Sequence, residues 1–263
     1  MFKKTYTIAL LILLIFNSAV IFAQQSNFSI SPPPIPWYEF SKSDWDTRVG
    51  LTYVRITGEI EEDEISGDLN VNGGGANIFT RYAFSDILAA DTGMLYAYAG
   101  GEIGDAADMT FSVFVLPFDI EFQPVKQDSF NILIFAGWNL AWTSININAD
   151  GPPSEELNLE TAMKGPQLGI EASFILSSFA ISPYFMMSKL EGKSDVEIKE
   201  NNSLVFSGSL NVSSTFVYNW GIDVLFIPYK ITLSSILQIA GDSKDSQPYN
   251  TLIISVSYNF SNK

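Results

Sequence analysis

Apolar and polar residues alternate with a period of two near the end of the chain, across Leu252–Phe260. Every second position of this stretch is large and apolar, and the positions between them are polar apart from Ile253. Successive side chains of a strand point to opposite faces, so this period predicts a β-strand. Its length and its aromatic end are those of a strand that crosses a membrane, apolar toward lipid and polar toward a lumen.

The same alternation recurs along the chain from Trp45 onward, and the apolar face is repeatedly rich in Phe, Tyr and Trp. About ten strands are predicted, within a range of eight to twelve set by how short segments are counted. They are Trp45–Gly58, Ala76–Phe84, Met94–Gly100, Thr110–Phe122, Phe130–Asn146, Pro166–Leu176, a seventh strand from Ser178 to Lys189, Leu210–Phe226, Ile231–Ala240 and Leu252–Phe260.

The connections between these strands alternate in length and charge. Short turns are predicted near residues 85, 125, 178 and 228, and longer loops between them hold most of the acidic residues. Outer-membrane barrels sort their connections in this way, with short periplasmic turns and long extracellular loops. Because hydrocarbon offers no water to the backbone, a closed sheet is the form of strand structure that can span it.

The chain therefore resembles the small outer-membrane β-barrel proteins of Gram-negative bacteria as a class, over about residues 45–260. The resemblance implies an all-β fold, a closed antiparallel transmembrane β-barrel. Barrels of the class usually end on the aromatic residue of the last strand, whereas here Ser261, Asn262 and Lys263 follow Phe260.

The N-terminus has the layout of a secretory signal peptide. Lys3 and Lys4 precede an apolar run that ends at Ala23, the expected cleavage site. An uncleaved anchor helix is the alternative reading. Residues 24–44 form a proline-rich leader that is expected to stay extended, in the periplasm or folded back as a partial plug. The barrel domain is then 45–263, in the outer membrane.

Composition excludes several classes of function. The formal net charge of −15 argues against a nucleic-acid partner, which requires clustered Lys and Arg. The chain has no Cys and no His, so neither a thiolate metal site nor a His-based catalytic triad can be built. No enzyme activity and no cofactor are expected.

Two local features have the composition of a ligand site. Gly73–Gly75 opens a predicted strand and not a helix, so it cannot present a helix N-terminus to a phosphate and indicates a loop–strand junction. The acidic run Glu59–Asp68 could hold Ca²⁺ or Mg²⁺, but it lacks the spacing of a calcium loop and is expected to be solvated.

Charged residues on the predicted lumen face form the candidate site. Charges facing lipid are costly, which favours inward placement. We expect two arginines and four carboxylates to form a polar network that narrows the periplasmic mouth, against the alternative of separate, locally solvated charges. They are Arg48, Arg81, Asp119, Glu121, Glu171 and Asp223.

The expected function is that of a narrow passive pore for small solutes, with outer-membrane lipid and those solutes as partners. Eight-stranded barrels are filled by side chains and wide channels need about sixteen strands, so about ten imply a narrow lumen. A non-conducting structural or surface-interaction barrel is the first alternative. A soluble secreted β-protein that binds an apolar ligand is the second.

Overall fold

The computed structural model describes residues 40–62, 65–103, 107–149, 154–240 and 249–261. The signal peptide and most of the leader lie outside these residues, so both stay predictions. Ten strands and one 3-10 turn make up the described chain. They are β1 (Trp45–Glu62), β2 (Ile65–Ala83), β3 (Leu88–Ile103), β4 (Ala107–Gln127), β5 (Phe130–Ala149), β6 (Glu155–Ile175), β7 (Phe179–Glu200), β8 (Ser203–Phe226), η1 (Ile227–Tyr229), β9 (Ile231–Ala240) and β10 (Tyr249–Ser261).

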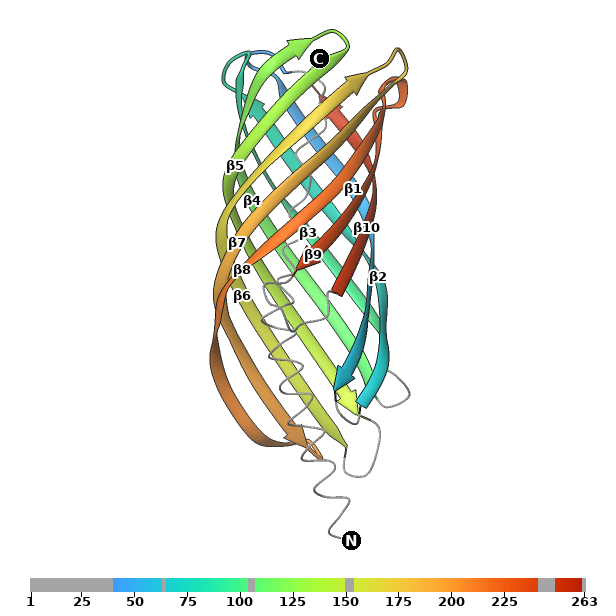
Figure 1. Ribbon diagram of the computed structural model, residues 1–263, viewed down its shortest axis with the longest axis vertical. Coiled ribbons are helices and arrows are strands. Elements are labelled where there is room, and N and C mark those ends of the chain that lie inside the picture. Colours follow the sequence, from blue (N-terminus) through green and yellow to red (C-terminus); the bar gives the residue numbers. More distant parts are fainter. Residues whose placement is uncertain (1–39, 63–64, 104–106, 150–153, 241–248, 262–263) are drawn as a thin grey trace.

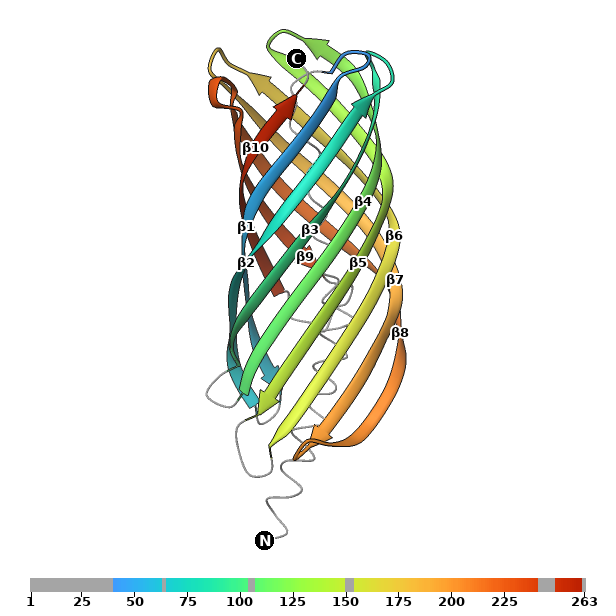
Figure 2. The same ribbon diagram turned by 180° about the vertical axis from the view of Figure 1, so that it is seen from behind.

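Each strand pairs antiparallel with its neighbours in sequence, and β1 pairs with β10 to close the barrel. The predicted closed antiparallel barrel of ten strands is thereby confirmed. The strands are tilted from the barrel axis, and all the short turns lie at the same end as the C-terminus (Figures 1 and 2). No helix among the described residues is long and apolar enough to cross a membrane.

The outer face is an apolar band, as the alternation predicts. On β10, Ile254, Val256, Tyr258 and Phe260 are between 42% and 50% exposed. Equivalent rows of Phe, Tyr, Trp, Leu and Ile cover the outside of the other strands. So much exposed apolar surface on a soluble protein would drive association, whereas lipid is its natural solvent.

The inner face consists of two layers, one mainly polar and the other mainly apolar. The layer near the short turns holds buried charges, amides and hydroxyls. Toward the opposite end of the barrel, where the long hairpins lie, the inward side chains become mostly apolar, although a polar lumen was expected throughout. This second layer, the apolar belt, consists of Val54, Ile56, Val71, Leu95, Ala97, Ala99, Met109, Phe111, Val113, Val115, Ala141, Ile145, Ile147, Leu157, Leu159, Val196, Ile236 and Ile253. Ile253, the exception in the last strand's pattern, is a member of it.

The acidic stretches are strands and not the long loops that their composition predicts. The described residues of the run Glu59–Asp68 belong to the paired ends of β1 and β2, and residues 63–64 lie outside the described residues. The stretch Glu191–Asn202 continues β7 to a tight turn at Asn201 and Asn202, whose φ angles are 49° and 63°. Two successive positive φ values match the twist of a hairpin, and Asn tolerates them. The hairpins are therefore longer at this end than the predicted strands.

Two further local predictions are wrong. Gly73 and Gly75 lie inside β2 and not at its start. Glycine is required at both positions because a Cβ at either would overlap the backbone of β3. Pro124 lies in a register shift of β4 between Phe122 and Val125, and not in a turn. A bulge leaves a residue out of the ladder, so it can accommodate a proline inside a strand.

Among the described residues, the strands of the barrel differ in length. β9 has 10 residues and β8 has 24, so β8 pairs with β9 only from Val217 to Phe226. Beyond this segment the β7–β8 hairpin extends past the end of β9 (Figure 1). Its tip exposes Leu204, Val205 and Phe206, each more than 40% accessible.

Three inward aromatic rings lie directly opposite glycines on the neighbouring strand. The pairs are Phe79–Gly93, Phe135–Gly169 and Tyr184–Gly221. A Cβ at any of these glycines would overlap the facing ring. An aromatic side chain laid over a strand glycine pins the register and covers the exposed backbone. These pairs therefore hold neighbouring strands in register at the inner wall.

A side chain at Gly221 is expected to displace the Tyr184 ring. We predict that Gly221→Ala lowers the free energy of unfolding by about 1–3 kcal/mol, the usual penalty for overpacking. Urea titration of the protein refolded into lipid vesicles measures the change. Gly74→Ala is the control, because a Cβ there lies 3.5 Å from its nearest neighbour, in ordinary contact. Equal losses in both variants would contradict the role given to the ring.

Candidate functional site

The polar layer contains all six charged residues that the sequence predicts for the lumen. All six are buried, and they come from β1, β2, β4, β6 and β8. Inward Asp46 and Asp91 join them. We call these eight residues the charge layer: Asp46, Arg48, Arg81, Asp91, Asp119, Glu121, Glu171 and Asp223. Glu171 lies four residues from the short-turn end of β6.

Arg81 links carboxylates on both sides of its own strand. Its Nη2 lies 3.0 Å from Asp46 Oδ2 on β1, and its Nη1 lies 3.3 Å from Glu121 Oε2 on β4. The Arg81 side chain is 1% exposed, so water contributes little to its solvation. In a low-dielectric interior such pairs are strong, and removal of one partner leaves the other charge buried and unpaired.

A second ion pair joins inward side chains of β1 and β8, which are not neighbours in the sheet. Arg48 Nη1 of β1 donates a hydrogen bond of 3.2 Å to Asp223 Oδ2 of β8. The Arg48 guanidinium also lies 5.4 Å from the centroid of the Phe79 ring, at cation–π distance. The two arginines thus tie together strands that are not adjacent in the sheet.

The other two predicted carboxylates are held by neutral donors. Gln167 Nε2 donates to both Asp119 oxygens, at 2.8 and 2.6 Å. Ser173 Oγ donates to Glu171 Oε1 at 2.8 Å. Hydrogen bonds from neutral groups satisfy a buried carboxylate without a second charge.

Sequence reasoning missed Asp46 and Asp91. Asp46 shares the inward parity of Arg48, and Asp91 shares that of Leu95 and Ala97, so alternation alone could have found both. Asp91 also lies in register between Arg81 on β2 and Asp119 on β4. Asp91 lies three residues before the predicted start of its strand at Met94, whereas Asp46 lies inside the predicted strand Trp45–Gly58.

Phe40 covers the charge layer from the short-turn end. Its ring is fully buried, and the Arg81 guanidinium lies 5.0 Å from its centroid. Lys126 Nζ donates to the Phe40 carbonyl oxygen at 2.8 Å, and Ala83, Ala89 and Leu133 pack around the ring. No signal in the sequence distinguishes this phenylalanine from its neighbours. The described end of the leader therefore lies over the barrel interior.

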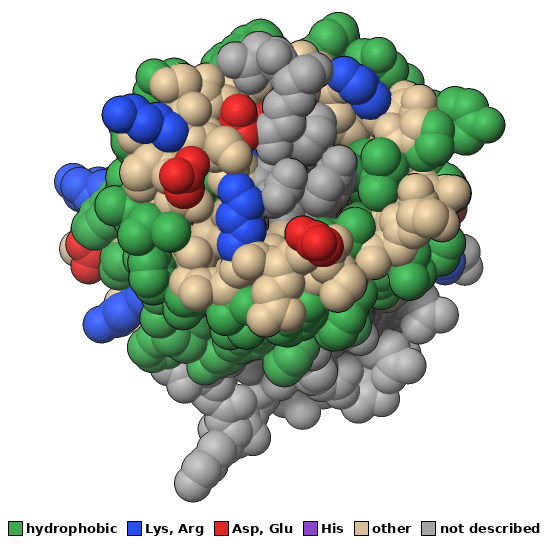
Figure 3. Space-filling view, turned by 90° about the horizontal axis from the view of Figure 1, so that it is seen from above, with side chains coloured by type: hydrophobic (Ala, Val, Ile, Leu, Met, Phe, Trp, Pro, Cys, Tyr) green, Lys and Arg blue, Asp and Glu red, His purple; other side chains and the backbone are tan. Residues whose placement is uncertain are grey.

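Seen from this end, charged side chains lie among polar ones around the mouth, and hydrophobic side chains form the outer rim (Figure 3). Six carboxylates face two arginines in the charge layer, so its formal charge is negative. Anions entering from this side would meet repulsion as well as the Phe40 ring. Among the described residues, no group of His, Cys, Asp or Glu is arranged to hold a metal ion.

The fold is that of the small outer-membrane β-barrel proteins of Gram-negative bacteria. The outer membrane protease OmpT from Escherichia coli superposes with a TM-score of 0.61 and 8% identity, over 86% of this chain and 100% of OmpT. The translocator domain of the autotransporter NalP from Neisseria meningitidis gives 0.49 and 13%, over 81% of this chain and 88% of that chain. An outer membrane channel from Pseudomonas putida F1 gives 0.46 and 10%, over 87% and 100%.

At these identities the similarity is one of fold. No protein-family model matches the sequence, and no curated protein is significantly similar to it.

Proposed function

We propose that the protein is a narrow passive pore of the outer membrane that carries small solutes. The observation that supports this most directly is the two-layered interior, with an apolar belt toward the hairpins and a charge layer under Phe40 toward the short turns. Short turns face the periplasm in this class of barrel, so the charge layer is assigned to the periplasmic mouth. Small uncharged solutes are the best match to a passage that is apolar at one end and acidic at the other.

We propose no catalytic activity. OmpT is a protease of the same fold, so the fold by itself leaves catalysis open. The residues argue against it, because the chain contains no His to serve as a general base near neutral pH. Five of the six charge-layer carboxylates contact arginine, amide or hydroxyl partners.

A second candidate function rests on the β7–β8 hairpin. Its tip stands beyond β9 and exposes Leu204, Val205 and Phe206, which is typical of a surface that contacts a partner. A barrel that conducts nothing and presents this hairpin would be a surface-interaction protein. A soluble apolar-ligand carrier is disfavoured by the apolar band on the outside of the barrel.

Phe40→Ala is expected to raise conductance at least several-fold, because it removes the ring that covers the charge layer. Single-channel recording in planar bilayers and swelling of vesicles in a small neutral sugar measure the effect. Phe122→Ala is the control, since Phe122 lies on the lipid-facing side near the same end. Silence of both the wild type and Phe40→Ala would contradict the pore and favour the surface-interaction protein. Heat-modifiable migration on SDS gels would exclude the soluble carrier.

A further inference from the structure

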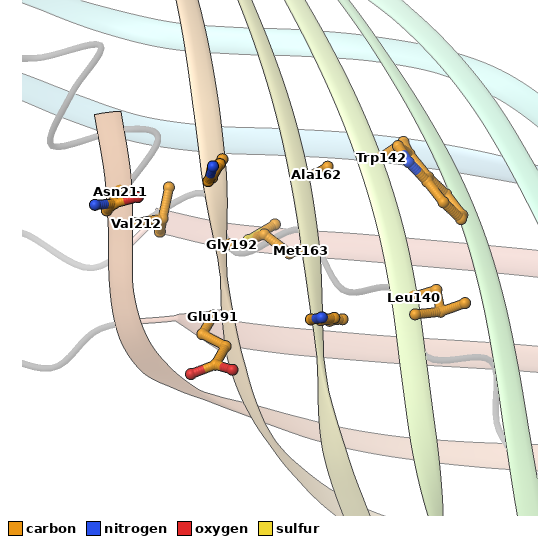
Figure 4. A pocket seen from close by; sticks show the side chains of 10 residues that line it. Leu140, Trp142, Ala162, Met163, Glu191, Gly192, Asn211 and Val212 are labelled. Atoms are coloured by element: carbon orange, nitrogen blue, oxygen red, sulfur yellow. The ribbon is translucent and has the colours of Figure 1, made fainter. Parts of the chain in front are cut away.

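The outer wall contains an open pocket that the pore does not use. It lies across β5–β8, has a volume of about 540 Å³, and is seen from close by in Figure 4. Two rows of paired, outward-facing residues form it. The first row is Trp142, Ala162, Lys193 and Asn211, and the second is Leu140, Lys164 and Glu191.

The hollow exists because its centre is made of small residues. Ala162 stands between Trp142 and Lys193 in the first row, where most outward residues of this wall are large. Gly192 follows a register shift of β7 at Leu190, and a Cβ there would overlap the β6 backbone at Ala162, so glycine allows the two strands to lie close beneath the hollow. The floor is therefore apolar, and the basic side chains stand at its rim.

The pocket lies where the outer face changes from apolar to polar. Along β5 the outward residues Trp138, Leu140 and Trp142 are followed by Ser144 and Asn146. On β6 the same change runs from Leu168 through Lys164 to Glu160. Trp and Lys at such a boundary mark the level of lipid headgroups. On the assignment of short turns to the periplasm, this is the headgroup level of the outer leaflet.

The lysines of the pocket are available for an external anion. Among the described residues, neither Lys164 nor Lys193 forms an ion pair within 4.0 Å, whereas Lys199 further along the hairpin pairs with Glu156 at 3.7 Å. The chain as a whole carries a net charge of −15, whereas both of these lysines stand on the outward face beside the pocket. Glu191 is the one carboxylate at the rim.

We propose that this pocket binds a phosphorylated lipid of the outer leaflet, of the lipid A type. Lys164 and Lys193 contact a phosphate from adjacent strands, and an acyl chain lies along Leu140 and Trp142. The chemistry is that of a charge-assisted contact between ammonium groups and phosphate oxygens, beside an apolar surface. The inference rests on the proposed outer-membrane location, but not on conduction of solutes.

Native mass spectrometry of the detergent-solubilised protein with added lipid A tests the site, with the same lipid after enzymatic dephosphorylation as the comparison. We expect tighter binding of the phosphorylated lipid. The double variant Lys164→Gln with Lys193→Gln should weaken that binding at least tenfold, and Glu191→Gln should strengthen it. Ala162→Phe should also weaken binding, because it fills the hollow without a change of charge.

Lys230→Gln is the matched control, since Lys230 follows η1 at the opposite end of the barrel. The proposal is overturned if the double variant binds as well as the wild type, if Lys230→Gln weakens binding equally, or if dephosphorylated lipid binds as tightly. Normal conductance together with absent lipid binding would contradict the proposed lipid site and leave the proposed pore standing. Silence in bilayers together with selective lipid binding would sink only the pore.

Discussion

Arg81→Ala is expected to lower the free energy of unfolding by about 3–5 kcal/mol, because it leaves the carboxylates of Asp46 and Glu121 buried without their cation. Those contacts measure 3.0 and 3.3 Å, and the side chains involved are at most 1% exposed. The same change removes the group that carries the Phe40 ring, so conductance should rise as stability falls. Urea unfolding in vesicles and single-channel recording measure the two effects.

Arg55→Ala separates this effect from loss of any arginine. Arg55 is an exposed residue on the outer side of β1, seven residues along the chain from Arg48. A surface charge of this kind contributes at most about 1 kcal/mol. If Arg81→Ala unfolds at the wild-type urea concentration and conducts as the wild type does, the charge layer is no network but a set of separate charges.

Phe111→Ala is expected to produce the second large effect, in the apolar belt. Phe111 is fully buried on the inner face of β4. Truncation of a buried Phe to Ala costs about 3–5 kcal/mol through lost apolar contact and the cavity left behind. If the belt lines the solute path, permeability to small neutral solutes should increase at the same time.

Phe114→Ala serves as the comparison for this experiment. Phe114 lies on the same strand with the opposite parity, toward lipid, where its ring packs on Trp142 at 5.7 Å between centroids. It should cost less stability and leave solute flux unchanged. A flux that is unaltered in Phe111→Ala, despite the lost stability, would show that the belt is only structural.

Much of the architecture could be predicted from the sequence. When apolar and polar residues alternate with a period of two, the alternation shows which face of the strand each residue occupies. The parity of Arg48, Arg81 and Asp223 was enough to place their side chains inside. Both arginines then lie close to a predicted carboxylate partner, at 3.2 Å for Arg48–Asp223 and 3.3 Å for Arg81–Glu121.

Strand ends were the weakest part of the prediction. Charged residues such as Glu59 and Glu191 indicate exposure to solvent, and exposure to solvent is typical of loops. A hairpin that rises above the membrane is solvated on its outer face and can carry the same residues within its ladder. Composition alone therefore cannot distinguish a long loop from an extended hairpin.

The division of the lumen into two layers could not be predicted from the alternation of apolar and polar residues either. Leu95, Ala97 and Ala99 alternate with Met94, Tyr96 and Tyr98, and a run that is apolar on both sides leaves its orientation open. Pairing with β2 and β4 settles which side is inside, and this information lies in other strands. The position of Phe40 depends in the same way on contacts with residues far along the chain.

Closure of the sheet has a consequence for biogenesis. The seam joins the first and last strands, from Asp46 opposite Ser261 to Thr57 opposite Asn250. Until the thirteen residues of β10 pair with β1, β1 is an open edge of the sheet with unpaired backbone amides. Contacts of such long sequence separation form slowly. We therefore expect truncation within β10 to leave the β1 edge unpaired and the sheet open, so that the chain aggregates through that edge.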